Sequence, residues 1–327
     1  MHIDVHAHAF IPHYHQLLAS MGIVIPSYTA DDAASSPADD AVTDGADALL
    51  RRIALMDDAG VDRQLLSAVF APYLADQADA VAAARCVNDA HAAAVRRHPD
   101  RLGAYAALPL PHLDASIAEL ERCLDELGMV GVALQCACLG ESVVAQRFDP
   151  LYEELNRRAA VLFFHPCVNG LCSGLITDWG LAPTAGTLFE DSTVALHLIV
   201  RRIPQRFPDI TVIIAHLGGG LPMMLSRLDN QLPLSCPDLP EKPSRTARRF
   251  FYDSVGHGSA AALRCAVDAF GADRILLGSD YPVLLAFESY RDTANYLRAN
   301  GFGPPALSEV VRNNAAQIFG QLFDRKD

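Results

Sequence analysis

The feature of this sequence that most constrains its fold is an alternation of short apolar runs with amphipathic segments from residue 49 onward. This alternation is typical of parallel strands that are each followed by a helix covering the sheet. The runs contain mostly Val, Ile, Leu and Phe, as expected of strands buried on both faces. Strands are predicted at residues 2–5, 64–70, 102–108, 130–135, 161–164, 211–215, 250–255 and 274–278. Eight such units predict a (β/α)₈ barrel, the TIM barrel fold.

Helix signals fill the gaps between these predicted strands. From Asp114 to Leu127, apolar side chains recur on one helical face, and Gly128 follows as a stop signal. Further helices are predicted at residues 46–59, 76–98, 193–202, 259–270, 289–300 and 308–319. The chain has 327 residues, of which 51% are hydrophobic, so it can bury a large core, and no linker separates a second domain. We therefore expect a single barrel domain over residues 1–327.

Two stretches interrupt the alternation. Residues 10–45 are rich in aspartate and contain prolines, and we expect a long loop insertion or lid there, after the first strand. Its acidic side chains, and His13 and His15 near its start, are expected to face solvent. Residues 169–191 follow the fifth strand. Both stretches lie on the face where barrel active sites are built.

Charge and terminal composition exclude several classes of partner. The formal net charge is −13 and there is no basic run, so neither a nucleic acid nor a membrane surface is an expected partner. The N-terminus lacks the pattern of a signal peptide, and no apolar stretch reaches the length of a membrane span, so we expect a cytoplasmic protein. The eight cysteines are scattered, and Cys136 and Cys138 lack the CxxC spacing, so buried thiols are expected rather than disulfides or a zinc site.

Five polar residues close predicted strands. The motif HAH ends the first strand, where alternation points the His6 and His8 imidazoles to the same side. Alone, such a pair is more often a surface feature than a metal site. However, His165, His216 and Asp280 close later strands in VLFFHP, TVIIAHLGGG and RILLGSDYP. Because all C-terminal strand ends of a barrel face one cavity, these five residues are expected to meet.

Three imidazoles and one carboxylate suit one divalent metal ion, which we expect to be held by His6, His8, His165 and Asp280. This mixed set favours Zn²⁺, with Mn²⁺ and Fe²⁺ as weaker alternatives. His216 is either a fourth imidazole ligand or a general acid or base beside metal-bound water, and we favour the second role. The three glycines after His216 form either a nest of backbone N–H groups or, as we prefer, a turn into the next helix.

The motifs HAH, FFHP, AHLGGG and GSDYP together resemble the amidohydrolase superfamily, and within it the branch of 2-amino-3-carboxymuconate-6-semialdehyde decarboxylase and related non-oxidative decarboxylases. The resemblance spans nearly the whole chain. GSDYP and the segment HLGGG-x-x-x-x-x-x-R-x-D are more specific than HxH, which the wider superfamily shares. The resemblance implies His6, His8, His165 and Asp280 as metal ligands, and His216 as the residue that activates metal-bound water.

Two further positions match this branch. Trp179 lies fourteen residues after His165, and Arg227 lies eleven residues after His216. The resemblance implies that both bind substrate and that Arg227 reaches into the neighbouring subunit's site, which requires a homodimer. On residue type alone, Trp179 is equally a packing residue, and Arg227 is an ordinary surface arginine.

The sequence also departs from the family. The family's substrate-binding Arg lies in the loop before the first amphipathic helix, whereas here Arg51 and Arg52 lie on that helix and are expected at the surface. Val283 follows GSDYP where the family enzyme has an aromatic residue. Both differences favour another carboxylate, of hydroxybenzoate or methylsalicylate type. Asp253 and His257, at the end of the seventh strand, are further candidates to line the cavity.

Three hypotheses for function follow from this site. The first, which the resemblance favours, is metal-dependent, non-oxidative decarboxylation of an unsaturated or aromatic carboxylic acid, without an organic cofactor. The second is hydrolysis of an amide or lactone at the same mononuclear centre, because a metal-bound hydroxide beside an imidazole attacks a carbonyl equally well. The third is a non-catalytic barrel in which four protein ligands hold a structural metal.

Overall fold

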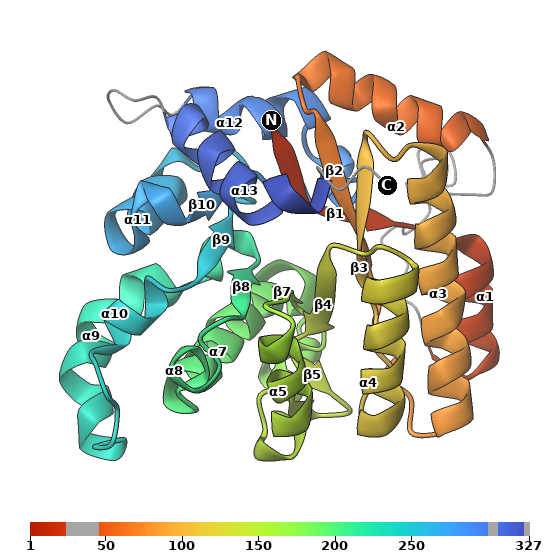
Figure 1. The fold of residues 1–327 in the computed structure, drawn as a ribbon. Helices are drawn as coiled ribbons and strands as arrows, with labels where there is room; N and C mark the ends of the chain where they lie inside the picture. The colour runs from red at the N-terminus through yellow and green to blue at the C-terminus, as the bar shows by residue number, and fades with distance from the viewer. Residues whose placement is uncertain (24–45, 300–306, 324–327) are drawn as a thin grey trace.

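A closed sheet of eight parallel strands forms the centre of the molecule (Figure 1). The computed structural model describes residues 1–23, 46–299 and 307–323. The strands, in spatial order, are β1 (Ile3–Ala9), β2 (Arg63–Ala68), β3 (Leu102–Ala106), β4 (Gly131–Gln135), β7 (Val161–His165), β8 (Thr211–Ile214), β9 (Phe251–Asp253) and β10 (Ile275–Leu276). Two bridges, Asp4 to Leu277 and Ala7 to Tyr281, join β1 to the segment around β10 and close the barrel. The predicted (β/α)₈ barrel is confirmed.

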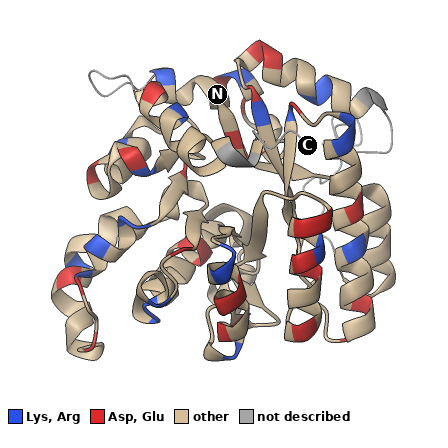
Figure 2. Cartoon of the chain, viewed as in Figure 1, with Lys and Arg blue, Asp and Glu red and all other residues tan. Residues whose placement is uncertain are grey.

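Helices surround this barrel (Figure 1). The longer ones are α2 (Ala46–Ala59), α3 (Gln77–Arg97), α4 (Leu113–Glu121), α5 (Asp149–Arg157), α7 (Thr187–Val200), α9 (Leu221–Ser235), α11 (Ala260–Phe270), α12 (Tyr290–Ala299) and α13 (Leu307–Phe323). Most charged residues lie on these helices and few on the strands (Figure 2). The shorter elements are α1 (Pro12–Ser20), α6 (Gly174–Thr177), α8 (Ile203–Arg206), α10 (Pro243–Ala247) and a small hairpin of β5 (Ala137–Cys138) and β6 (Glu141–Ser142).

Two apolar layers hold the barrel together. One fills its interior with strand side chains such as Val5, Tyr105 and Phe163, and α13 adds Ala315 and Phe319 to the same cluster. The other, larger cluster lies between the strands and the outer helices. Because β-strands expose alternate side chains to opposite faces, both layers require strands with apolar residues on both faces, and most of the strands have them, as the sequence predicts.

The predicted loop insertion after the first strand is partly wrong. Residues Pro12–Ser20 form helix α1, with Pro12 at its first position, where the missing backbone N–H costs nothing. Tyr14 and Leu18 bury the inner face of α1, whereas the predicted loop would have been exposed. The remainder of the predicted loop, residues 24–45, lies outside the described residues.

The cysteines are only partly buried, in contrast to the expectation of buried thiols. All eight cysteines are free, and three of them are buried, four half-buried and one, Cys172, exposed. Within the described ranges, no helix combines the length and apolarity needed to cross a bilayer.

Candidate metal centre

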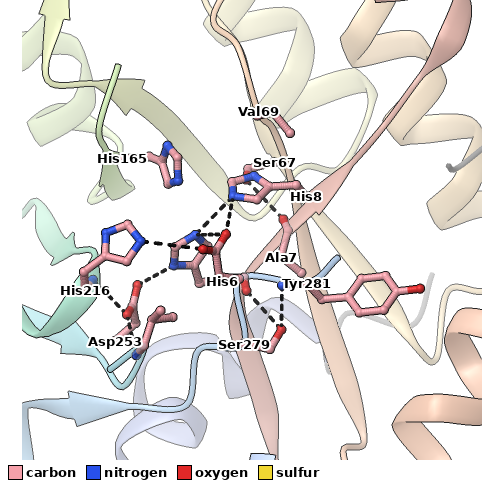
Figure 3. A network of polar contacts seen from close by, with 12 residues as sticks. His6, Ala7, His8, Ser67, Val69, His165, His216, Asp253, Ser279 and Tyr281 are labelled. Carbon is pink, nitrogen blue, oxygen red and sulfur yellow. Dashed lines mark hydrogen bonds and ion pairs between the residues drawn. The ribbon is translucent and has the colours of Figure 1, made fainter. Parts of the chain in front are cut away.

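The two histidines of β1 face each other inside the mouth of the barrel (Figure 3). Their Nε2 atoms lie 3.2 Å apart, and both side chains are fully buried. The pairing of β1 with β2 shifts register between Asp4 and Ala7. This irregularity allows Val5 to fill the apolar interior while the next residue, His6, also turns toward the barrel mouth.

His165 and Asp280 complete a compact group with this pair. His165 ends β7, and Asp280 follows β10 with a positive φ of 52° that turns its carboxylate inward. One potential ligand atom from each of the four side chains lies within 4.8 Å of all the others. Asp280 Oδ1 is 3.3 Å from His6 Nε2 and 3.0 Å from His8 Nε2. The structure therefore brings the four predicted ligands together, and their role as ligands stays a prediction.

The chemistry of this group fits a divalent cation. Burial lowers the pKa of His8 and of His165, so both imidazoles favour the neutral form that binds metals. Burial opposes ionisation of Asp280, but nearby His6 outweighs it and holds the pKa of this carboxyl well below its usual range. Asp280 Oδ1 is buried without a hydrogen-bond partner. A cation would satisfy this oxygen and separate the facing lone pairs of the imidazoles.

The outward-facing nitrogens of the β1 histidines are also engaged. Asp253 Oδ2 lies 2.7 Å from His6 Nδ1, and Ser67 Oγ lies 3.0 Å from His8 Nδ1. Burial opposes a charge on His6, but Asp253 and Asp280 outweigh it and raise the pKa of His6 to about 9. Partners of this kind fix ring orientation and leave the other nitrogen free to bind a metal. Asp253 thus lies beside the cluster, as the sequence suggested.

The loop after β7 is held by one buried carboxylate. Glu190, on α7, accepts hydrogen bonds from four successive backbone N–H groups, those of residues 167–170. His165 Nδ1 lies 3.0 Å from the carbonyl oxygen of Pro166 at the start of this loop. Glu190 therefore ties the segment that follows His165 to α7.

His216 lies at the edge of the cluster. Its Nε2 is 3.7 Å from Asp280 Oδ2, and its Nδ1 is 2.8 Å from Asp191 Oδ2. Burial opposes protonation of His216, but Asp191 outweighs it and raises the pKa of His216 well above its usual value. The ring centroid of His216 is 5.2 Å from that of His6 and 5.8 Å from that of His165. His216 therefore lies beside the four-residue group, and its role as an acid or base stays a prediction.

Other predicted site residues do not join this cluster within the chain. Trp179 is 76% exposed, between α6 and α7, and Arg227 is exposed on α9. His257 is exposed and its ring lies 5.6 Å from that of Phe287. His13 is exposed as expected, whereas His15 is half-buried.

The expectation that Arg52 lies at the surface is wrong. Arg52 is 1% exposed, and its guanidinium lies 4.3 Å from the centre of the Tyr281 ring. It donates hydrogen bonds to Gln64 Oε1 at 2.6 Å and to the His8 carbonyl oxygen at 2.8 Å. Arg51 is exposed. Arg52 therefore supports the back of β1 directly behind a predicted ligand.

Sequence reasoning missed two groups of residues around the cluster. Asp4, fully buried, accepts hydrogen bonds from Gln64, Ser279 and Tyr290. A carboxylate between the apolar residues Ile3 and Val5 was the available signal for Asp4. Glu190 and Asp191 form the second group, and an acidic pair inside an apolar helix was the signal there.

Comparison with known protein families decides the relationship of this chain. The family model for Amidohydrolase, Amidohydro_2, matches residues 3–321. The chain belongs to this amidohydrolase family. The match covers every strand of the barrel, from β1 to β10.

Relatives within the family are decarboxylases. The chain is 29% identical to a gamma-resorcylate decarboxylase from Rhizobium radiobacter over 284 residues, covering 82% of this chain and 86% of the relative. It is 29% identical to a 2-amino-3-carboxymuconate-6-semialdehyde decarboxylase from Dictyostelium discoideum over 269 residues, covering 78% of this chain and 74% of the relative. The branch that the motifs predict is therefore confirmed.

Solved structures show the same fold. A 2,6-dihydroxybenzoate decarboxylase complexed with 2,6-dihydroxybenzoate superposes with a TM-score of 0.78 at 26% identity, covering 98% of this chain and 100% of the other. A dihydroxybenzoic acid decarboxylase from Polaromonas, solved with bound manganese and 2-nitroresorcinol, gives a TM-score of 0.78 at 24% identity, covering 98% and 97%.

Proposed function

We propose that this amidohydrolase is a metal-dependent carboxy-lyase that releases CO₂ from an aromatic or unsaturated carboxylic acid of hydroxybenzoate type, without an organic cofactor. The observation that carries this proposal is the buried His/His/His/Asp group with His216 beside it, at the strand ends of a barrel whose relatives are decarboxylases. The bound 2,6-dihydroxybenzoate of one related structure supports the substrate class.

A divalent ion, Zn²⁺ or Mn²⁺, would be held by His6, His8, His165 and Asp280. Bound there, it would supply a Lewis acid that polarises a substrate oxygen. Three nitrogens and one oxygen suit zinc, and the manganese in the related Polaromonas structure supports the second choice.

The protein's own contribution is a positioned proton donor. His216 Nε2 faces the cluster, and its partner Asp191 favours the protonated ring. In the proposed reaction, His216 delivers a proton to the ring carbon that bears the carboxylate. The bond from that carbon to the carboxylate then breaks, its electron pair returns to the ring, and CO₂ leaves.

A homodimer completes the proposal, with Arg227 and Trp179 binding substrate. Exposed apolar side chains gather on the segment from α6 to α7 and at the start of α9: Leu175, Trp179, Leu181, Leu188, Phe189 and Met223. The two segments touch, because Gly220 N donates to Ser192 Oγ at 2.8 Å. Exposed apolar side chains on neighbouring segments are typical of an interface. Arg227 lies on the same helix as Met223, where it would reach the substrate carboxylate of a neighbouring subunit.

The deciding experiment measures CO₂ release from a panel of hydroxybenzoates, methylsalicylates and unsaturated acids. Protein reconstituted separately with Zn²⁺ and Mn²⁺ should release CO₂ from at least one acid, and chelated protein should not. His216→Gln should abolish turnover while metal content stays at wild-type level. Hydrolysis of amides or lactones without CO₂ from any acid would establish the second hypothesis instead, and tightly bound metal with no turnover of either kind would establish the third.

A further inference from the structure

The His216 ring lies between two carboxylates, that of Asp191 outside the four-residue group and that of Asp280 within it. Asp191, on α7, is fully buried, and its Oδ2 is 2.8 Å from His216 Nδ1. On the opposite side of the ring, Nε2 faces Asp280 within the cluster, at 3.7 Å. Because an ionised carboxylate only accepts hydrogen bonds, Asp191 requires a proton on Nδ1. Nε2 is then the nitrogen that exchanges a proton with whatever occupies the cluster.

The backbone around His216 cannot fix this ring alone. His216 and Leu217 have φ angles of 51° and 55°, in the left-handed region that residues other than glycine rarely adopt. His216 N donates to Asp253 Oδ1 at 3.0 Å, and Gly220 N donates to Ser192 Oγ. These contacts hold the turn through its backbone N–H groups and do not involve the His216 ring. Asp191 is the group that holds the ring itself.

The second oxygen of Asp191 shows that this carboxylate is poorly suited to a purely structural role. Asp191 Oδ1 is buried without a hydrogen-bond partner. A buried acceptor left unsatisfied costs about 1–3 kcal/mol, and an apolar residue at this position would avoid that cost. The contact with His216 is the one hydrogen bond that the Asp191 side chain makes among the described residues.

We infer that Asp191 is the positioning residue of His216: it fixes the ring orientation and the proton on Nδ1, so that Nε2 faces the metal cluster. Asp191 lies outside the four-residue group, and it acts through His216 alone. This inference rests on the proposed function for its effect on turnover. Its effect on the His216 ring stands on the geometry and can be measured without any substrate.

The test compares Asp191→Asn with wild type by NMR of ¹⁵N-histidine in zinc-loaded protein, with His216 assigned from its missing signals in His216→Gln. Wild type should carry a proton on Nδ1. An asparagine amide can donate to Nδ1, so the variant ring should lose its proton on Nδ1 and keep a proton on Nε2 alone. Asp268→Asn, an exposed position on α11, is the matched control and should leave the His216 signals unchanged.

Turnover gives the second readout. Asp191→Asn should lower kcat about 100-fold with little change in KM, because general acid–base catalysis contributes factors of this size. Metal content should stay at wild-type level. A bare Nδ1 in wild type, or wild-type kcat in Asp191→Asn, would overturn the inference. If wild type releases CO₂ from no acid, the proposed function fails separately, and the NMR signals alone decide the role of Asp191.

Discussion

At the scale of single residues, the candidate site depends on side chains that never reach its centre. Each of three imidazoles, those of His6, His8 and His216, has a polar partner at its outer nitrogen. Such partners set which nitrogen is free to act, and that choice decides metal affinity and proton transfer. The site therefore extends well beyond the residues that would touch a metal.

Arg52 is one of these supporting side chains, and its loss should be costly. Arg52→Met keeps the apolar stem but removes the donors to Gln64 and to the His8 carbonyl, so the free energy of unfolding should fall by about 3 kcal/mol. Urea unfolding of the metal-free protein measures this. Arg51→Met, at the exposed neighbouring position, should cost less than about 1 kcal/mol. Equal losses in the two variants would show that Arg52 has no special supporting role.

The sequence predicts which side chains form the cluster, but it does not predict the buried side chains that hold them in place. His6, His8, His165 and Asp280 could be identified because barrel topology alone carries strand ends to one mouth. Arg52 and Arg51 are adjacent residues of the same type, and only the folded structure distinguishes them, because it buries Arg52 against Tyr281, Gln64 and the His8 carbonyl. Asp191 lies on helix α7, and its contact with His216 depends on side-chain geometry. The spacing of residues in the sequence does not predict such a contact.

At the scale of elements, α7 connects two parts of the site. Its consecutive residues Glu190 and Asp191 hold the loop after His165 and the ring of His216 respectively. Two buried carboxylates near the start of α7 thus connect this helix to both loops. The sequence pattern placed the start of this helix at residue 193, whereas the structure starts it at Thr187, and both carboxylates fall in the difference.

Glu190→Gln tests the first of these links. The glutamine amide would turn donor hydrogens toward backbone N–H groups of residues 167–170, so the unfolding free energy should fall by about 2 kcal/mol. Zinc affinity should also fall, because the loop begins next to His165. Metal competition and urea unfolding measure the two effects. Glu153→Gln, at an exposed position on α5, should change neither. Wild-type zinc affinity in Glu190→Gln would separate this loop from the metal centre.

Helix α3 carries a pH-dependent contribution to stability. His91 is fully buried, and burial lowers its pKa to about 4. The unfolded chain therefore takes up the proton first, so this stability is complete above about pH 6.5 and is lost as pH falls toward 4. His91→Leu should remove about 2 kcal/mol of the loss between pH 7 and pH 5. Unfolding at both pH values, with exposed His13→Leu as control, measures it. An unchanged pH slope in His91→Leu would contradict the expectation.

At the scale of the whole molecule, the proposed dimer makes the sharpest prediction. Light scattering should give twice the chain mass, and Trp179→Ser should weaken association because it removes an exposed aromatic from the apolar surface. Leu234→Ser, which removes an equally exposed apolar side chain at the far end of α9, should leave the mass unchanged. A monomer in wild type would remove the basis for a shared site.

Mixing inactive variants then tests the role of Arg227. Arg227→Ala and His216→Ala should each be inactive alone. After subunit exchange, about a quarter of wild-type activity should return, because half of the dimers are mixed and each of these has one intact site built from both chains. No recovery in demonstrably mixed dimers would place Arg227 outside its neighbour's site.

The closing of the barrel has a consequence for how the site is made. β1 is synthesised before the other seven strands of the barrel, but it pairs with the segment around β10, and Asp280 follows that segment. All eight strands of the barrel must therefore be synthesised before Asp280, the fourth predicted ligand, can join the two β1 histidines. Nascent chains that stop before residue 280 should bind zinc weakly. Metal loading should therefore follow the synthesis and pairing of the segment around β10.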